Sequence, residues 1–282
     1  MKKDLIVTSI SSNYSWNDLK NWIHSLYKTT YKGDVLCVCY NYNGNEEILQ
    51  KIKSYGIEII IPNNTYTGDQ CDQFIFNSGH INKSNSHIAV HNVRFFHTWQ
   101  YLVESQLEYN RVINTDIRDI VFQYNPSEWL DKNFHGELLA PCEEITYTES
   151  WNYSNAVKSF GPYVHEYYLK SNFVCNAGTF AAKYETFKIV CLVNYLISCN
   201  TGINADQVGM NILFNSLKNV QLARMTDGWA LQVGGVIQNV LNHTQIEDNK
   251  FYVKDKKEQF CIIHQYDRIP EFKKMIDNTY EK

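Results

Sequence analysis

The amino-acid sequence predicts a single α/β domain in which helices flank a mostly parallel central sheet. Between residues 5 and 61, apolar runs of strand length alternate with amphipathic helical stretches, a pattern typical of parallel strands with helices on the sheet faces. The 282 residues are enough for one large domain with a sizeable core. No internal repeat, low-complexity stretch or linker divides the chain, so we expect residues 1–282 to form one domain.

The first part of the chain should supply the parallel strands. Residues 5–10 form an apolar run that predicts the first strand. A helix should follow, because Ser15 and Asp18 have the spacing of a capping box and the next apolar residues recur at helical spacing. The remaining elements of this alternation are a strand at 34–40, a helix at 46–55 ended by Gly56, and a strand at 57–61.

The rest of the chain has a more varied pattern. We expect residues 63–85 to be irregular because they are polar, and a helix to cover about 86–108 before a strand at 111–115. Asn204 is placed to cap a later helix. The other predicted elements are helices at 127–134, 184–199 and 204–218, two short helical stretches within 142–170, and strands at 137–140, 173–182, 220–224 and 260–264.

The charge and the cysteines exclude several classes of protein. The formal net charge is −4 and no Lys- or Arg-rich run occurs, so the footprint of a nucleic-acid-binding protein is missing. No apolar segment approaches the roughly 20 residues that span a bilayer, and the first residues do not resemble a secretory signal. We therefore expect a cytoplasmic protein without a transmembrane segment. The eight cysteines contain no C-x-x-C pair, and reduced free thiols fit that compartment.

The chain is rich in aromatic residues, with 20 Tyr, 14 Phe and 6 Trp. Flat rings pack against sugar faces and nucleobases, but they also fill protein cores. The Tyr-rich segment 145–170, which includes Trp151, and the separate Trp229 therefore have two interpretations, an acceptor platform or core packing. Glu143 and Glu144 are either acids that orient an acceptor hydroxyl or solvated loop residues. The aromatic surface would also allow a homodimer.

The most informative segment is the acidic turn that follows the strand at 111–115. Asp116 and Asp119 lie there, and in open α/β sheets ligands bind outside the carboxyl ends of the strands. Carboxylates can hold a divalent cation that offsets the charge of a departing diphosphate. The two acids can share one ion only if the chain bends between them. Alternatively, Arg118 faces the diphosphate, because a guanidinium binds phosphate with two parallel hydrogen bonds. An Asp–Arg pair in a solvated loop is the third interpretation.

The run from Asp116 to Gln123, DIRDIVFQ, resembles the aspartate motif of glycosyltransferases with the A-type fold, in the branch that carries D-x-R-D. More remotely, it is similar to glycosyltransferase family 8, in which D-x-D follows an apolar strand. The chain departs from D-x-D because Arg118 occupies the third position. Further segments resemble parts of those enzymes in the same order along the chain: Val7-Thr8-Ser9, Arg94-Phe95, Asn176-Ala177-Gly178, Asp206-Gln207 with Asn211, and Phe260 to Arg268.

The resemblance implies a nucleotide-diphospho-sugar transferase fold, with a nucleotide-binding half at about 1–125 and a sugar- and acceptor-binding half at about 126–282. It implies a nucleotide-sugar donor, foremost a UDP-sugar, and a glycan, protein or small-molecule acceptor. A divalent metal, Mn²⁺ or Mg²⁺, is expected at Asp116, Asp119 and His264. The implied catalytic residues are Asp116, Asp206 and Gln207, and the implied substrate-binding residues are Thr8, Ser9, Arg94, Arg118, Asn176 and Gly178.

Because the amide of Gln207 is a poor nucleophile, we expect a front-side substitution that retains the anomeric configuration. The departing phosphate would take the proton of the acceptor hydroxyl, so no dedicated base is needed. Two other functions remain alternatives. A sugar-phosphate nucleotidyltransferase usually carries a Gly-rich run with a basic residue after the first strand, where this chain has Ser11 to Ser15. A non-catalytic sugar- or nucleotide-binding module would fit the replacement of the second aspartate by Arg118.

Overall fold

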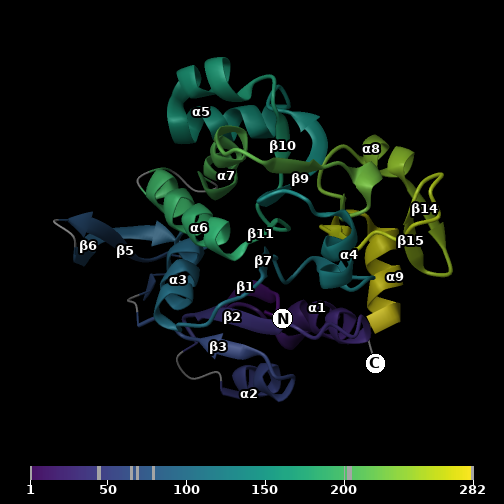
Figure 1. The fold of residues 1–282 in the computed structure, drawn as a ribbon, viewed down its shortest axis with the longest axis horizontal. Helices are drawn as coiled ribbons and strands as arrows, with labels where there is room; N and C mark the ends of the chain where they lie inside the picture. Colours follow the sequence, from purple (N-terminus) through teal and green to yellow (C-terminus); the bar gives the residue numbers. More distant parts are fainter. Residues whose placement is uncertain are drawn as a thin grey trace.

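The computed structural model describes residues 2–42, 46–63, 66–67, 70–77, 80–199, 201 and 205–280. A central sheet with helices on both sides forms the body of the molecule (Figure 1). Its strand order is β10-β9-β11-β7-β1-β2-β3, and β12 pairs with β9. The strands are β1 (Leu5–Ser11), β2 (Asp34–Tyr40), β3 (Glu58–Ile60), β7 (Arg111–Asn114), β9 (Leu138–Thr146), β10 (Phe173–Cys175), β11 (Ala181–Lys183) and β12 (Val220–Ala223).

The block of strands around β1 is parallel. β1 pairs with β2 on one side and with β7 on the other, and β2 pairs with β3. β12 is also parallel to β9, whereas β11 runs antiparallel between β7 and β9. These pairings confirm the predicted α/β fold with a mostly parallel central sheet flanked by helices. Because parallel strands end at the same edge, the carboxyl ends of β1, β2 and β7 lie together.

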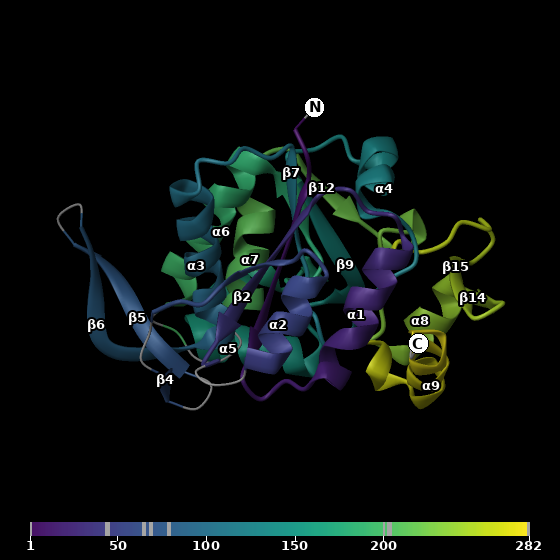
Figure 2. The ribbon, with the colours of Figure 1, turned by 90° about the horizontal axis from the view of Figure 1, so that it is seen from below.

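Side chains along β1 alternate between two apolar layers. Leu5 and Val7 belong to the layer packed against α3, α6 and α7. Ile6 and Ile10 belong to the opposite layer, packed against α1 and α2. Figure 2 shows α3, α6 and α7 on one side of the sheet and α1 on the other. These helices are α1 (Trp16–Lys28), α2 (Glu46–Ser54), α3 (Val90–Glu104), α6 (Tyr184–Ser198) and α7 (Ala205–Ser216). Each fully buried aliphatic side chain contributes roughly 1.5–3 kcal/mol, so the two layers fix the strand ends firmly.

A second, three-stranded sheet brings the C-terminal part of the chain to the acidic turn. Its order is β13-β16-β8, with β16 parallel to β13 and antiparallel to β8. The register places His264 opposite Ile120, the residue after Asp119, and opposite Gln232 on the other side. Strand pairing thus positions the histidine that the sequence singled out. The bounds are β8 (Ile120–Phe122), β13 (Ala230–Gln232) and β16 (Ile262–His264).

The other elements surround these two sheets. The α9 helix packs beside α1, where Asn21 Nδ2 donates a 2.8 Å hydrogen bond to Asp277. The sequence did not predict α9, although its buried residues Phe272, Ile276 and Tyr280 recur every four positions. The remaining elements are α4 (Pro126–Asn133), α5 (Ser150–Val164), η1 (His165–Leu169), η2 (Met225–Asp227), α8 (Ile237–His243), β14 (Thr244–Glu247), β15 (Lys250–Val253), η3 (Tyr266–Arg268) and α9 (Pro270–Tyr280).

The prediction that residues 63–85 are irregular is wrong. They contribute to a three-stranded antiparallel sheet, β4-β5-β6, that extends away from the body of the molecule (Figure 2). The outer part of this sheet projects into solvent, where Ile75 and Ile81 are exposed, whereas Cys71 and Ile88 at its base are buried in the core, so its strands lack a regular apolar alternation. The following helix begins at Val90 instead of residue 86. The strands are β4 (Tyr66–Thr67), β5 (Gln70–Asn77) and β6 (His80–Ala89).

In the second half of the chain, the observed elements differ from the predicted ones in smaller ways. The run at 173–182 is two strands, β10 and β11, separated by the Asn176-Ala177-Gly178 turn. The Tyr-rich segment forms α5, which kinks at Gly161 (φ 83°) and continues as η1. The predicted cap Asn204 lies outside the described residues. Among the described helices, none combines the length and the apolar character needed to cross a lipid bilayer.

Candidate active site

The acidic turn lies at the carboxyl end of β7, where its backbone is held on two sides. Thr115 N donates to Val7 O at 2.9 Å, and Asp116 N donates to Gly178 O at 2.9 Å. A Cβ atom added to Gly178 would lie 2.7 Å from Cγ of Asp116, inside van der Waals contact. Glycine is therefore required at position 178 for the turn of residues 176–178 to approach the Asp116 carboxylate.

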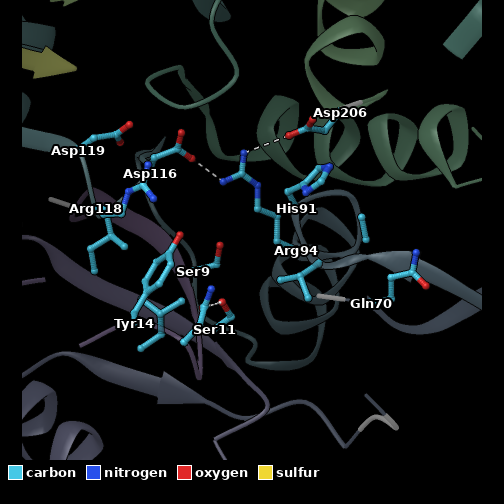
Figure 3. A pocket seen from close by; sticks show the side chains of 15 residues that line it. Ser9, Ser11, Tyr14, Gln70, His91, Arg94, Asp116, Arg118, Asp119 and Asp206 are labelled. Atoms are coloured by element: carbon cyan, nitrogen blue, oxygen red, sulfur yellow. Dashed lines mark hydrogen bonds and ion pairs between the residues drawn. The ribbon is translucent and has the colours of Figure 1, made fainter. Parts of the chain in front are cut away.

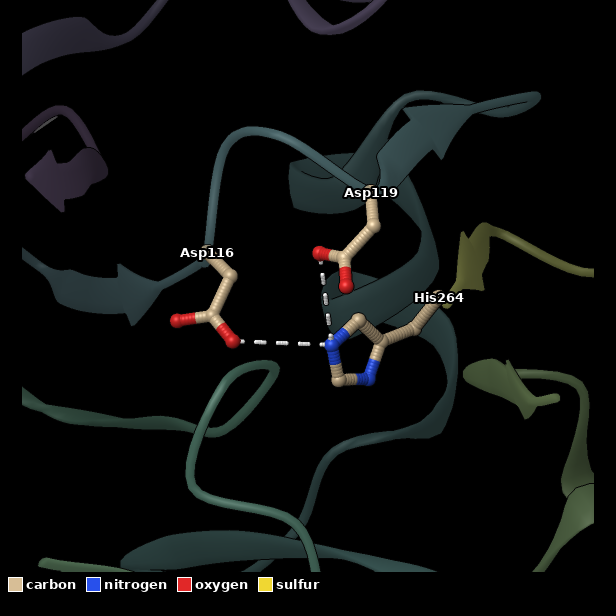
Figure 4. A group of neighbouring side chains, drawn as sticks. All are labelled: Asp116, Asp119 and His264. Atoms are coloured by element: carbon tan, nitrogen blue, oxygen red, sulfur yellow. Dashed lines mark ion pairs between the residues drawn. The ribbon is translucent and has the colours of Figure 1, made fainter. Parts of the chain in front are cut away.

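Asp116, Asp119 and His264 form a compact cluster (Figure 4). Nε2 of His264 lies 3.5 Å from Oδ2 of Asp116 and 3.8 Å from Oδ1 of Asp119. One potential ligand atom from each residue lies within 4.8 Å of the others. The chain bends between the two aspartates, as sharing one ion requires.

The orientation of His264 suits a metal ligand. Its Nδ1 is 2.7 Å from Oε1 of Gln232, and the Gln232 amide is fixed in turn by donating to Oγ1 of Thr179 at 2.8 Å. An amide oxygen only accepts, so Nδ1 carries the proton and the lone pair of the neutral ring is on Nε2. This Nε2 is buried and has no hydrogen-bond partner among the described residues. A buried orphan nitrogen aimed at two carboxylates fits a divalent cation.

Burial and the neighbouring charges have opposing effects on the pKa values of the cluster residues. Burial by itself would raise the pKa of Asp116, but Arg94 and His264 outweigh this effect and hold the pKa below its ordinary value. For Asp119, burial dominates and raises the pKa. Burial would lower the pKa of His264, yet the carboxylates of Asp116 and Asp119 raise it above its ordinary value. The cluster thus has an excess of acidic groups, which a bound cation would relieve.

Arg94 links the acidic turn to helix α7. Its Nη1 lies 2.6 Å from Oδ1 of Asp116 and its Nη2 lies 3.3 Å from Oδ2 of Asp206, so the guanidinium stands between the two carboxylates (Figure 3). Burial would lower the pKa of Arg94, but the two carboxylates raise it, so the side chain remains charged. Asp206 is positioned further by its backbone N–H, which donates to Oδ1 of Asn92 at 3.1 Å.

These groups face a cleft of about 840 Å³, which we call the first cleft. Its volume lies within the range of about 300–1,000 Å³ that is usual for small-molecule sites. Six predicted site residues line it together: Ser9, Arg94, Asp116, Arg118, Asp119 and Asp206. Residues that the sequence analysis did not select also line it, among them Ser11, Tyr14, Gln70 and His91 (Figure 3).

The other predicted residues lie next to this cleft. Thr8 is buried, and its Oγ1 has no hydrogen-bond partner among the described residues. Asn176 is also buried: its Oδ1 accepts a 2.6 Å hydrogen bond from Gly178 N, and its Nδ2 donates to Glu143 at 2.7 Å. Gln207 faces a neighbouring cleft of about 490 Å³, the second cleft. The structure thus gathers all the predicted residues around one edge of the sheet.

The sequence analysis missed two supporting residues. Gln232 fixes the His264 ring, and Glu143, which was left open between two roles, is buried and bound to Asn176. No local pattern marks Gln232, because only the pairing of β13 with β16 brings it to His264. For Glu143, the length of β9 is the missing information. The strand continues to Thr146, so Glu143 lies within the sheet and not in a loop.

The fold is similar to that of a solved glycosyltransferase. The apo form of the glycosyltransferase GlyE from Streptococcus pneumoniae TIGR4 matches with a TM-score of 0.52 at 10% sequence identity. The match covers 94% of this chain and 55% of that chain, so this chain spans just over half the length of the solved protein. Neither a protein-family profile nor a curated protein sequence matches. The chain therefore has an α/β fold seen in a glycosyltransferase, with a carboxylate–imidazole cluster at the carboxyl edge of its sheet.

Proposed function

We propose that this protein transfers a sugar from a nucleoside-diphosphate sugar, of the UDP class, to a hydroxyl group of an acceptor. The observation that carries the proposal is that Asp116 and Asp119, with His264 buried beside them, meet the Arg94–Asp206 pair in one cleft. The cluster suits a diphosphate with its counter-ion, and the pair suits the hydroxyl groups of a sugar. The similarity of the fold to a glycosyltransferase supports the same class of reaction.

The diphosphate requires positive charge beside the acidic turn. A divalent ion, Mn²⁺ or Mg²⁺, held by Asp116, Asp119 and Nε2 of His264 would supply this charge and act as a Lewis acid toward the leaving group. Arg118 lines the first cleft with a side chain that is 49% exposed, and its ion pair with Asp267 is long, at 3.9 Å, so its fork of donors would turn to phosphate oxygens at little cost. The cation and the guanidinium would then act together, although the sequence presented them as alternatives.

The sugar would lie between Arg94 and the start of α7. Asp206 accepts hydrogen bonds from sugar hydroxyls, and Arg94 holds the Asp206 carboxylate in place and donates to the same region. Gln207, the next residue of α7, faces the second cleft and would border the sugar there. Tyr14 and Ser9 also line the first cleft, and we assign the nucleoside to their side of it; the Tyr14 ring is the candidate to stack on the base.

The reaction follows from these positions. The acceptor oxygen forms a bond to the anomeric carbon while the bond from that carbon to the diphosphate oxygen breaks, on the same face of the sugar. The proton of the acceptor hydroxyl passes to an oxygen of the departing phosphate. The configuration is retained, and the amide of Gln207 does not form a covalent intermediate because it is a poor nucleophile. Arg94 and Arg118 stabilise the negative charge that develops on the diphosphate.

The proposal is tested by measuring UDP release from UDP-glucose, UDP-galactose and UDP-N-acetylglucosamine, with Mn²⁺ and with EDTA. We expect slow, Mn²⁺-dependent release without an acceptor, and its loss in Asp116→Asn. The matched control is Asp248→Asn, which removes the same charge in the turn between β14 and β15. Thermal stabilisation by a nucleotide-sugar with no release by the wild-type protein would identify a non-catalytic binding module. Neither stabilisation nor release, with any of the three donors, would refute the proposal.

A further inference from the structure

The second cleft adjoins the first at the start of α7. Asp206 lines the first cleft and Gln207, the next residue, lines the second. A chain of hydrogen bonds also joins them: Asn176 receives the N–H of Gly178, which contacts Asp116, and donates to Glu143 on the wall of the second cleft. A molecule in the second cleft would therefore lie next to the reacting end of a donor in the first.

Glu143 gives the second cleft a polar floor. This side chain comes from β9 and is only 6% exposed, yet it lines the cleft. Its Oε1 accepts the 2.7 Å hydrogen bond from Asn176. Among the described residues no other hydrogen bond to the Glu143 carboxylate is found, so Oε2 is available to accept one from a ligand hydroxyl. A buried carboxylate of this kind needs such a partner, because an unpaired buried acceptor costs free energy.

Trp151 and the start of α8 give the same cleft apolar walls. Trp151, in the first turn of α5, is 53% exposed although it is a large apolar ring, and it lines the cleft. Ile237, the first residue of α8, and Val236 before it also line the cleft and are exposed, at 54% and 44%. In Figure 1, α5 and α8 appear on opposite sides of β9. Exposed apolar groups around a polar floor match a sugar ring, which has apolar C–H faces and a polar rim.

We propose that the second cleft binds a neutral sugar unit of the acceptor, with Trp151 stacked on the sugar ring and Glu143 accepting a hydrogen bond from its reactive hydroxyl. This inference rests on the proposed glycosyltransferase function and narrows the acceptor from any hydroxyl compound to a glycan or glycoside. Glu143 is a positioning residue here: it aims the hydroxyl, and the proton still leaves to the diphosphate.

The charged residues that line the second cleft are Glu143, Glu149 and Arg268, so carboxylates outnumber cations there and neutral sugars are favoured over anionic ones. The carboxylate of Glu149 already caps α5, accepting from Trp151 N at 3.0 Å and Asn152 N at 2.9 Å. Glu143 has no cation within ion-pair distance among the described residues. A carboxylate on the acceptor would therefore face the buried carboxylate of Glu143, and like charges repel more strongly where one of them is buried.

The experiment measures UDP release with a donor that the wild-type protein hydrolyses, in the presence of 4-nitrophenyl β-glycosides. We expect the glucoside, the galactoside or the N-acetylglucosaminide to accelerate release at least tenfold over hydrolysis, and the glucuronide to have little effect. If the donor is hydrolysed but none of the neutral glycosides accelerates release, this inference fails while the proposed function stands. If the donor is not hydrolysed at all, both fail.

Variants then locate the binding site. Trp151→Ala should raise the KM of the best glycoside about tenfold, since loss of a stacked ring costs roughly that factor. The matched control is Tyr167→Ala, which removes a ring that is 80% exposed, on η1 directly after α5 and outside the second cleft. An equal KM change in both variants, or no change in Trp151→Ala, would overturn the assignment.

Glu143→Gln tests the selectivity without removing the hydrogen bond to Asn176, because the glutamine oxygen still accepts it. The ratio of kcat/KM for the neutral glycoside to that for the glucuronide should fall about tenfold or more, as the repelling charge is removed. A purely structural role of Glu143 would lower both rates in parallel and leave the ratio unchanged, and that result would overturn the proposal.

Discussion

Gly178 touches the Asp116 carboxylate so closely that a single added methyl group would lie 2.7 Å from its Cγ atom. The same turn also accepts the Asp116 backbone N–H at 2.9 Å. The position of the Asp116 carboxylate, the proposed metal ligand, is therefore set by a neighbouring strand connection as well as by its own loop. This contact gives a specific way to displace Asp116 without altering its charge.

Gly178→Ala should impair binding of Mn²⁺ and nucleotide-sugar while the protein remains folded. The added methyl group must displace the Asp116 side chain or the turn, and overpacking of this kind typically costs 1–3 kcal/mol, or roughly tenfold or more in affinity. Calorimetric titration with Mn²⁺ and UDP measures the effect. The control is Gly56→Ala, where φ is 71° and no atom lies within 4 Å, so strain lowers stability but affinity should be unchanged. Wild-type affinity in Gly178→Ala would contradict this account of the turn.

Arg94→Met should abolish donor binding, because Asp116 and Asp206 lose their shared cation. Breaking a buried ion pair costs about 3–5 kcal/mol of stability, so the melting temperature should also fall. Arg111→Met is the matched control. Arg111 pairs with Asp4 and Asp131 at the other end of β7, and its loss should lower stability without affecting donor binding. Donor affinity by calorimetry and unfolding by urea separate the two effects; equal donor affinity in both variants would be inconsistent with the assigned role.

Gln232→Leu should weaken metal binding about 10–100-fold, as is typical when the group that orients a histidine ligand is removed. Without Gln232, Nδ1 of His264 loses its 2.7 Å partner and the ring loses its fixed tautomer. Gln221→Leu is the control, because Gln221 contacts residues 133 and 135 and lies outside both clefts. Mn²⁺ affinity measured by calorimetry or electron paramagnetic resonance distinguishes them. If the Mn²⁺ affinity of Gln232→Leu equals that of the wild-type protein, His264 is not a metal ligand.

His97 should make folding stability depend on pH. Burial lowers the pKa of His97 to about 3, whereas in the unfolded chain the pKa is near 6.5. The unfolded state binds the proton more readily, so this contribution is present above pH 6.5 and is lost as the pH falls toward 3. Between pH 7 and pH 5 the wild-type protein should lose about 2 kcal/mol through this group. Urea unfolding at both pH values should show that His97→Gln loses less free energy of unfolding than the wild-type protein. Equal losses in the two proteins would show that His97 is not the source of the pH dependence.

Local patterns were sufficient for the elements of the central sheet. The run at 5–10 and the capping box of Ser15 and Asp18 appear as β1 and α1, because burial on both faces of a parallel sheet leaves continuous apolar strands. The strands of the projecting β4-β5-β6 sheet are buried at their base, at Cys71 and Ile88, but exposed farther out at Ile75 and Ile81, and they carry no such signal. An isolated polar strand has the same composition as a loop, so composition could not distinguish them.

The candidate site was predictable only where its residues are close together in the sequence. Asp116, Asp119 and Arg118 lie in one short segment, so a motif can represent them. His264 is far away in sequence, and its place beside Asp119 depends on the antiparallel register of β16 with β8. Register depends on long-range packing, which no window of residues contains. Gln232 and Glu143 show the same limit, since each acquires its partner only through the folded sheet.

The pairing of β8 with β16 has a consequence for biosynthesis. The imidazole of His264 is translated almost 150 positions after Asp116, so a growing chain displays two acidic groups and an arginine long before this proposed metal ligand exists. Affinity for the cation should arise only as the last strand of that small sheet docks. If the cluster binds a cation as we propose, a fragment that stops before β16 should therefore bind manganese only weakly.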